Sequence, residues 1–167
     1  MRIVLPDRER WILSLKAVLT DGKDRCLLLR RSPANRYNVG KWEFPGGKAI
    51  RGETLGLALT REVREETGLD IALVRVLGAA SSRRQRRPVI YLVVQATSRS
   101  TGVQLSEEHD RHRWVPLGDL TQMELAPQFM PIARQISEDQ GGTRVPWPRA
   151  RRSGRRKSSA AVRASFP

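Results

Sequence analysis

The chain has 167 residues, 39% of them hydrophobic, which suits a single domain with one core. Its formal net charge is +14, and it lacks the run of about 18 apolar residues that a membrane-spanning helix requires, so an integral helical membrane protein is excluded. Cys26 is the only cysteine, which excludes an internal disulfide, and residues 1–7 lack the apolar core of a signal peptide. We therefore expect a cytoplasmic protein.

Two strands are predicted in the N-terminal part of the chain. Residues 11–19 alternate in hydrophobicity as a strand does, and residues 25–30 follow after a turn at 21–24. Cys26 lies in the second apolar run and is expected to be buried packing rather than a reactive thiol. The loop 31–40, which contains Pro33, Asn35 and Asn38, leads into the segment 42–44.

A helix is predicted from Thr54, which suits an N-cap after a Gly-rich turn, to about Thr67, with Gly68 as its end. One stripe of this helix is expected to face the core and then to become acidic. It runs through Leu55, Ala58, Leu59, Glu62, Glu65 and Glu66.

The acidic end of this stripe indicates a metal site. Glu62 and Glu66 are like charges one helical turn apart, which destabilise a helix unless a cation lies between them. Mg²⁺ prefers such oxygen ligands and often completes its shell with substrate phosphates. The alternative is a solvated acidic face paired with Arg61 and Arg64, but the position of the acids on the apolar stripe favours the metal.

Strands and one helix are predicted for the remainder. Residues 71–80 and 89–96 are rich in β-formers and are separated by a basic connection at 81–88. Short strands are expected at 103–105 and 113–115, and a helix at about 127–138. His109 and His112 flank Asp110 with a spacing that matches no zinc motif, so both are expected to be loop residues.

The segment 44–69 resembles the Nudix box of the Nudix hydrolases. Phe44-Pro45-Gly46-Gly47 begins a pattern of Gly, five residues, Glu53, seven residues and Arg61-Glu62-Val63-Arg64-Glu65-Glu66-Thr67-Gly68-Leu69. With Trp42, Glu43 and Lys48 it resembles the MutT-like branch, and weaker similarity covers residues 11–135. The resemblance implies an α/β fold of the Nudix type, an α/β/α sandwich with a mixed β-sheet and a loop-helix-loop. It also implies Mg²⁺-dependent hydrolysis of a nucleoside diphosphate linked to another group.

The resemblance also implies roles for individual residues. Metal ligands would be the Gly46 carbonyl and the carboxylates of Glu62, Glu65, Glu66 and Glu108, the last chosen from the adjacent acids Glu107 and Glu108 in a distant loop. The residues with catalytic roles would be Glu53, Arg61, Glu62 and Glu65. Arg61 would brace the glutamates, and Glu53 would support the loop and helix or a metal-bound water. Mg²⁺ is expected, and Mn²⁺ stays open because it accepts the same ligands.

Substrate contacts are expected from Arg31, Trp42, Gln128 and Phe129. Arg31 would lie near the phosphates, although it also suits a surface charge at a strand end. Trp42 and Phe129, like Tyr37, are candidates to stack on a base, and simple packing is the alternative for each. The resemblance places Phe129 at the position that contacts the base in MutT-like enzymes. If the alignment with the family is shifted by one residue, Gln128 would occupy that position instead. The arginines at 83, 84, 86 and 87 would attract a polyphosphate or form a solvated loop.

The C-terminal segment differs from the rest of the chain. Residues 141–167 contain eight Lys or Arg and no acid, so we expect a domain at 1–140 followed by a flexible basic tail. The tail would bind nucleic acid or acidic surfaces weakly, or it would have no dedicated partner.

Three functions stay open at this point. The first is MutT-like hydrolysis of a nucleoside triphosphate to a monophosphate and pyrophosphate. The second is hydrolysis of ADP-ribose or a dinucleoside polyphosphate. The third is a non-catalytic Nudix-like protein that binds nucleotide or nucleic acid. Monomer and homodimer are both compatible with the sequence.

Overall fold

The structure is a computed structural model that describes residues 11–84 and 87–141. Its strands are β1 (Ile12–Thr20), β2 (Arg25–Arg31), β3 (Trp42–Glu43), β4 (Ile71–Arg84), β5 (Arg87–Ser98) and β6 (His109–Pro116). Its α-helices are α1 (Leu55–Thr67) and α2 (Met130–Gly141), and short 3₁₀ helices span Leu117–Gln122 and Pro127–Phe129. None of the helices in this part of the chain is long and apolar enough to cross a membrane.

Within the described residues, six strands form one mixed sheet in the order β3-β2-β1-β5-β4, with β6 also paired to β2. β1 and β5 are parallel, in a register that runs from Ile12 opposite Val89 to Thr20 opposite Thr97. The other strand pairs are antiparallel. The other edge of β1 is occupied near its middle by the segment 45–47, because Leu15 and Ala17 donate backbone hydrogen bonds to Gly47 and Pro45.

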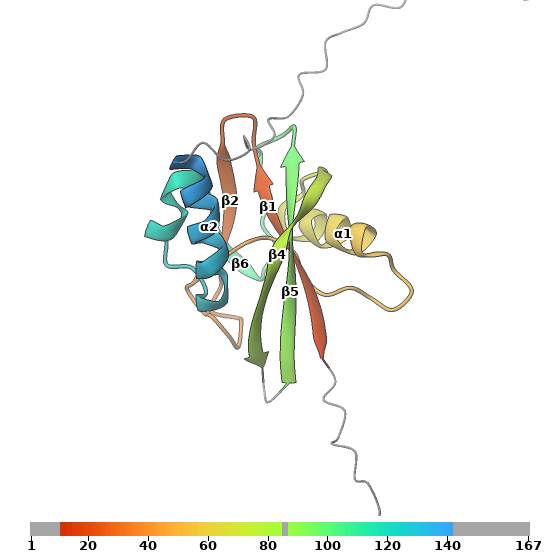
Figure 1. Ribbon diagram of the computed structural model, residues 1–167. Helices are drawn as coiled ribbons and strands as arrows, with labels where there is room; N and C mark the ends of the chain where they lie inside the picture. The colour runs from red at the N-terminus through yellow and green to blue at the C-terminus, as the bar shows by residue number, and fades with distance from the viewer. Residues whose placement is uncertain (1–10, 85–86, 142–167) are drawn as a thin grey trace, which may run out of the picture.

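The two helices lie on opposite faces of the sheet (Figure 1). Alternate residues of a strand point to opposite faces, and β1 therefore contributes to two hydrophobic clusters. Leu15, Ala17 and Leu19 pack with Ala58, Leu59 and Val63 of α1. Val18 packs on the other side, in the cluster that holds Phe129, Ile132, Ala133 and Ile136. The predicted α/β/α sandwich with a mixed sheet is confirmed.

Helix α1 has the predicted ends. The Thr54 side chain accepts a hydrogen bond from the Leu57 amide, and Gly68 adopts the left-handed conformation with φ of 71°. One part of the predicted stripe is wrong, because Leu55 is 44% exposed. The first turn lies over the outer edge of the sheet, next to Leu73 of the edge strand β4, which is itself exposed. Cys26 is buried and free, as expected.

Three other predictions are corrected by the structure. Residues 103–105 form no strand, because the backbone amides of Gln104 and Ser106 bind the carbonyls of Thr67 and Glu66 at the end of α1. The expected basic loop is a hairpin in which β4 and β5 continue to Arg84 and from Arg87. His109 and His112 belong to β6, where they pair with Arg31 and Leu29.

The C-terminal helix starts later than predicted. Residues 127–129 form a 3₁₀ turn, and α2 proper begins at Met130 and ends at Gly141. Arg86 and the expected basic tail from residue 142 onward lie outside the described residues.

Candidate active site

A cavity of about 210 Å³ lies where β1, the segment 46–48 and α1 meet. Three acids line it, Glu62, Glu66 and Glu108, together with four basic residues, Lys16, Arg31, Lys48 and Arg84. Its apolar wall is formed by Ile12 of β1 and by Val89 and Tyr91 of β5. The cavity therefore offers carboxylates for a cation, positive charge for an anion and apolar surface for an uncharged group.

The Gly46-Gly47 turn is held against β1 so closely that side chains do not fit. Gly46 has φ of 121°, and a Cβ there would lie 2.4 Å from the Leu15 carbonyl oxygen. A Cβ on Gly47 would lie 2.1 Å from a carboxylate oxygen of Glu62. The two glycines thus allow the turn to approach both the strand and the helix carboxylate.

Glu66 connects α1 to the same turn. Its carboxylate Oε2 accepts a hydrogen bond from the Gly46 amide at 2.6 Å, and its side chain lines the cavity although the residue is only 7% exposed. Burial raises the pKa of Glu66 to about 7, against the opposing effects of Lys16 and His109. A buried carboxyl with this pKa is a group whose charged form needs a cation.

This raised pKa predicts how the metal-free protein responds to pH. Between the ordinary value of 4.5 and about 7, the folded state binds the Glu66 proton more tightly than the unfolded state. The resulting stabilisation is complete below pH 4.5 and is lost as the pH rises through 7. We expect the free energy of unfolding in EDTA to fall by about 2–3 kcal/mol from about pH 5 to about pH 8.

Denaturant titrations at several pH values measure this dependence, with Glu66→Gln as the matched variant. The variant is expected to show a flatter profile, because it lacks the carboxyl whose proton uptake differs between the folded and unfolded states. A wild-type profile that rises with pH over this range would contradict the assignment.

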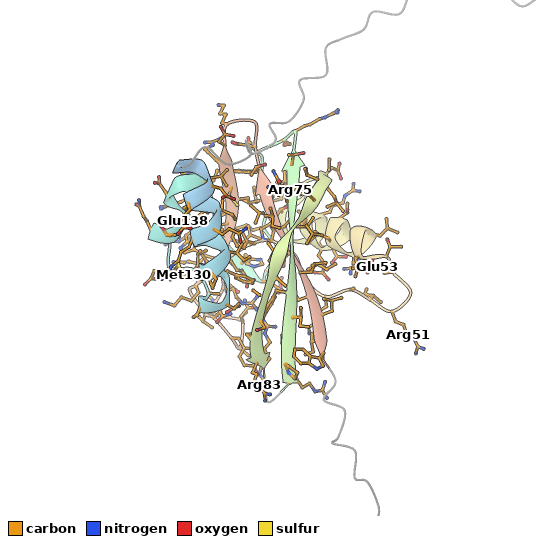
Figure 2. All side chains as sticks on the ribbon, viewed as in Figure 1. Arg51, Glu53, Arg75, Arg83, Met130 and Glu138 are labelled. Carbon is orange, nitrogen blue, oxygen red and sulfur yellow. The ribbon has the colours of Figure 1, made fainter. Side chains whose placement is uncertain are left out.

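Arg61 braces the carboxylates as expected. Its guanidinium binds Glu53 through two nitrogens, at 2.8 and 3.0 Å, and Glu62 through Nη1 at 3.0 Å. Hydrogen bonds to Glu53 and then Glu62 raise the pKa of Arg61 above its usual range. Glu53 also accepts the Ile50 amide, so it ties the loop to the start of α1, where Figure 2 shows it. Arg61 thereby fixes the Glu62 carboxylate beside Gly47.

Of the other acids that were candidate metal ligands, only one lines the cavity. Glu65 is on the outer side of α1, where its side chain is 59% exposed and lies 3.1 Å from Arg61 Nη1, and it does not line the cavity. Glu108 lines the cavity, whereas Glu107 does not. The loop that carries both is fastened to the end of β2, because the Ser32 amide and the Asn35 side chain donate to the Glu108 carbonyl.

A buried charge cluster beneath the cavity was not anticipated from the sequence. Glu43 accepts from Arg31 at 2.8 Å and lies 3.4 Å from Lys16 Nζ and 3.3 Å from His109 Nε2. Although burial acts to raise it, Lys16, His109 and Arg31 hold the pKa of Glu43 well below its usual range. A single lysine inside the apolar strand 11–19 was the available signal, but its partners are distant in sequence.

Arg31 lines the cavity in a fixed orientation. Besides Glu43, its guanidinium donates to the Tyr37 carbonyl at 3.0 Å and to the Asn35 side chain. The basic hairpin also contributes one arginine, since Arg84 lines the cavity and lies 5.4 Å from the Tyr37 ring centroid. Figure 2 shows the neighbouring Arg83 at the far end of β4.

The predicted base-binding residues lie elsewhere. Phe129 is fully buried between Phe44 and Tyr91, with ring centroids 5.6 and 5.1 Å away, so it offers no face to a base and the stacking prediction is wrong. Trp42 and Gln128 do not line the cavity in the described part of the chain. Trp42 packs against the cluster on the α2 side. The apolar residues that line the cavity in the described part of the chain are instead Ile12, Val89 and Tyr91.

The chemistry of these donors fits a divalent cation whose coordination shell is completed by the substrate. Glu62, Glu66 and Glu108 supply hard oxygen atoms, and the Gly46-Gly47 turn lines the same cavity. Among the described residues, no three acidic, histidine or cysteine side chains gather closely enough to form a metal site unaided. Mg²⁺ is commonly held by one or two carboxylates together with waters and substrate phosphates, which agrees with this arrangement.

The cavity has carboxylates that suit a divalent cation and basic side chains that suit phosphate groups. Hydrolysis of a phosphoric anhydride needs both kinds of group. The comparisons agree, because the model of the NUDIX domain matches residues 12–140. The chain belongs to the NUDIX family and is a hydrolase, and members of this family generally use divalent cations.

Three relatives illustrate the similarity. CTP pyrophosphohydrolase of Escherichia coli K12 is 34% identical over 110 residues, which cover 66% of this chain and 81% of that protein. Nucleoside triphosphatase NudI of Salmonella schwarzengrund is 31% identical over 114 residues, 61% of this chain and 81% of that protein. The crystal structure of the MutT protein from Methanosarcina mazei Go1 has a TM-score of 0.74 and 32% identity, and covers 81% of this chain and 99% of that one.

Proposed function

We propose that the protein hydrolyses a nucleoside triphosphate to a nucleoside monophosphate and pyrophosphate, with Mg²⁺ as the working ion and Mn²⁺ as a substitute. One observation carries the proposal: three carboxylates and four cationic side chains line the same cavity. A triphosphate chain with a bound cation satisfies both sets of charges. The similarity to a CTP pyrophosphohydrolase of Escherichia coli and a nucleoside triphosphatase of Salmonella supports a triphosphate as substrate.

The residues of the cavity have distinct roles in this proposal. Glu62 and Glu66 of α1 would hold the cation, and Glu108 on the loop before β6 lines the same cavity. A bound divalent cation would neutralise the phosphates and lower the pKa of a coordinated water. Lys48 and Arg84 attract the phosphate chain, while Arg61 keeps Glu62 in position through its 3.0 Å ion pair. Glu65 supports Arg61 from outside the cavity.

The nucleoside end is assigned to the apolar wall. Ile12, the partly exposed member of this wall, provides apolar surface against which a base packs, and the pair formed by Arg84 and Tyr37 borders it. Apolar surface and one arginine bind bases without strict hydrogen-bond selection. We therefore expect several nucleoside triphosphates to be accepted, with rates that differ by base.

Product analysis with Mg²⁺ tests the function directly. The panel contains the common and the oxidised nucleoside triphosphates, ADP-ribose and a dinucleoside polyphosphate. Release of monophosphate and pyrophosphate from triphosphates is the expected result. Turnover confined to ADP-ribose or the dinucleotide would replace the proposed substrate class, and tight nucleotide binding without turnover of any compound would contradict the proposed reaction.

A further inference from the structure

Lys16 is the one charged residue of β1, and its residue surface is only 4% exposed. Its ammonium nitrogen donates to the Gly46 carbonyl at 2.5 Å and lies 3.4 Å from Glu43 Oε1. Buried lysines are rare because an ammonium loses hydration, so a partner must compensate it. Here one of those partners is the carbonyl of the glycine turn in the active site.

The strand dictates this contact. Leu15 and Ala17, the neighbours of Lys16, donate their amides to Gly47 and Pro45 at 2.7 and 2.8 Å. The segment 45–47 therefore runs along β1 directly beside Lys16. Leu15 and Ala17 belong to the core cluster under α1, whereas the Lys16 side chain lines the cavity. Lys16 thus brings an ammonium group to the wall where a cation has to bind.

Lys16 shares the compensation of the buried Glu43 carboxylate with two other basic residues. Arg31 binds the same carboxylate oxygen at 2.8 Å, and His109 Nε2 lies 3.3 Å from it. The Lys16 ammonium therefore serves both the Glu43 carboxylate and the Gly46 carbonyl of the cavity wall. A divalent cation near Gly46 and Glu66 would meet an ammonium already hydrogen-bonded to the turn, and two cations a few ångström apart repel.

We propose that Lys16 is an internal cation that takes the Gly46 carbonyl and weakens divalent-ion binding in the free protein. This inference rests on the proposed function of Glu62 and Glu66 as the cation-binding carboxylates. Its consequence is that the carboxylates of the free protein would hold a divalent cation weakly beside Lys16. A bound triphosphate, whose negative charge outweighs Lys16, would let them hold it more tightly. Lys16 then makes metal binding depend on substrate.

Mn²⁺ titration of the metal-free full chain, followed by electron paramagnetic resonance of the free ion, tests the proposal without any turnover. Lys16→Met keeps the length of the side chain and removes its charge. We expect this variant to bind Mn²⁺ at least about tenfold more tightly than the wild type. Lys48→Met is the matched control, because Lys48 is an exposed lysine that lines the same cavity, whereas the hydrogen bond to the Gly46 carbonyl comes from Lys16. It should change the affinity by less than about threefold.

Unchanged or weaker Mn²⁺ binding in Lys16→Met would overturn the proposal, since a purely structural lysine predicts one of these results. Circular dichroism checks that Lys16→Met is folded. If it is not, it is replaced by the double variant Lys16→Met with Glu43→Gln, which removes both charges of the buried pair. Glu66→Gln added to Lys16→Met should abolish the tightened site. If Mn²⁺ binds none of the proteins, even with a non-hydrolysable triphosphate present, the proposed cation site fails as well. Binding by the wild type without tightening in Lys16→Met overturns the Lys16 inference alone.

Discussion

Glu66→Gln is expected to lower turnover by roughly 10³-fold while the chain stays folded. The Glu66 carboxylate combines burial, a 2.6 Å hydrogen bond from the Gly46 amide and a place in the cavity wall. Glutamine keeps the shape and retains an oxygen that accepts the Gly46 amide, but it carries no charge for a cation. The loss therefore falls on cation binding and chemistry rather than on packing.

Measurements of stability distinguish a loss of cation binding in Glu66→Gln from a loss of folding. Burial raises the pKa of Glu66 to about 7, so its charged form costs stability at high pH in the metal-free protein. The uncharged variant is expected to unfold at the same or a higher denaturant concentration than the wild type at about pH 8. Steady-state kinetics and urea titrations of the same preparations measure both effects.

Glu138→Gln is a suitable control for Glu66→Gln. Glu138 is an exposed residue of α2, and Figure 2 shows it on the side of the sheet opposite α1. The same chemical change there should leave turnover within about twofold of the wild type. Near-normal activity of Glu66→Gln, or an equal loss in both variants, would show that Glu66 is not the central carboxylate of the site.

Local signals explain why α1 and its roles were predictable. The N-cap Thr54, the left-handed Gly68 and the spacing of Arg61 from Glu53 and Glu62 all act within a single turn-helix unit. Such features depend on residues close in sequence, so a motif determines them. The resemblance to the Nudix box was confirmed on this basis, and the mixed sandwich followed from the same family relation.

Long-range contacts explain what was missed. Lys16, Glu43 and His109 lie on three different strands, and only the packed sheet brings their charges together. Residues 103–105 have β-forming side chains, but their backbone serves the end of α1 instead of the sheet. Phe129 is a flat ring near the expected base site, yet Phe44 and Tyr91 enclose it. Propensity and alignment do not reveal which of two neighbouring rings faces the cavity.

Gly47→Ala is expected to reduce turnover by about 100-fold or more without a large loss of stability. The added Cβ would lie 2.1 Å from Glu62 Oε2, a distance at which one of the two groups has to move. The carboxylate is the end of a flexible side chain, so Glu62 rotates away and its 3.0 Å ion pair with Arg61 is lost. Gly47 does not have a positive φ, and alanine therefore fits its backbone without strain.

Two further glycine variants make this result specific. Gly22→Ala is the control, because a Cβ at Gly22 meets nothing within 4 Å, and it should leave turnover unchanged. Gly46→Ala should instead destabilise the fold, since Gly46 has φ of 121° and its Cβ would approach the Leu15 carbonyl. Urea titrations distinguish the Gly46 effect from the Gly47 effect, and kcat measured below the unfolding range reports on Glu62. Normal kcat in Gly47→Ala would mean that the Glu62 position beside the turn is unnecessary for the reaction, and the carboxylate assigned to the cation would then have to be Glu66 or Glu108 without Glu62.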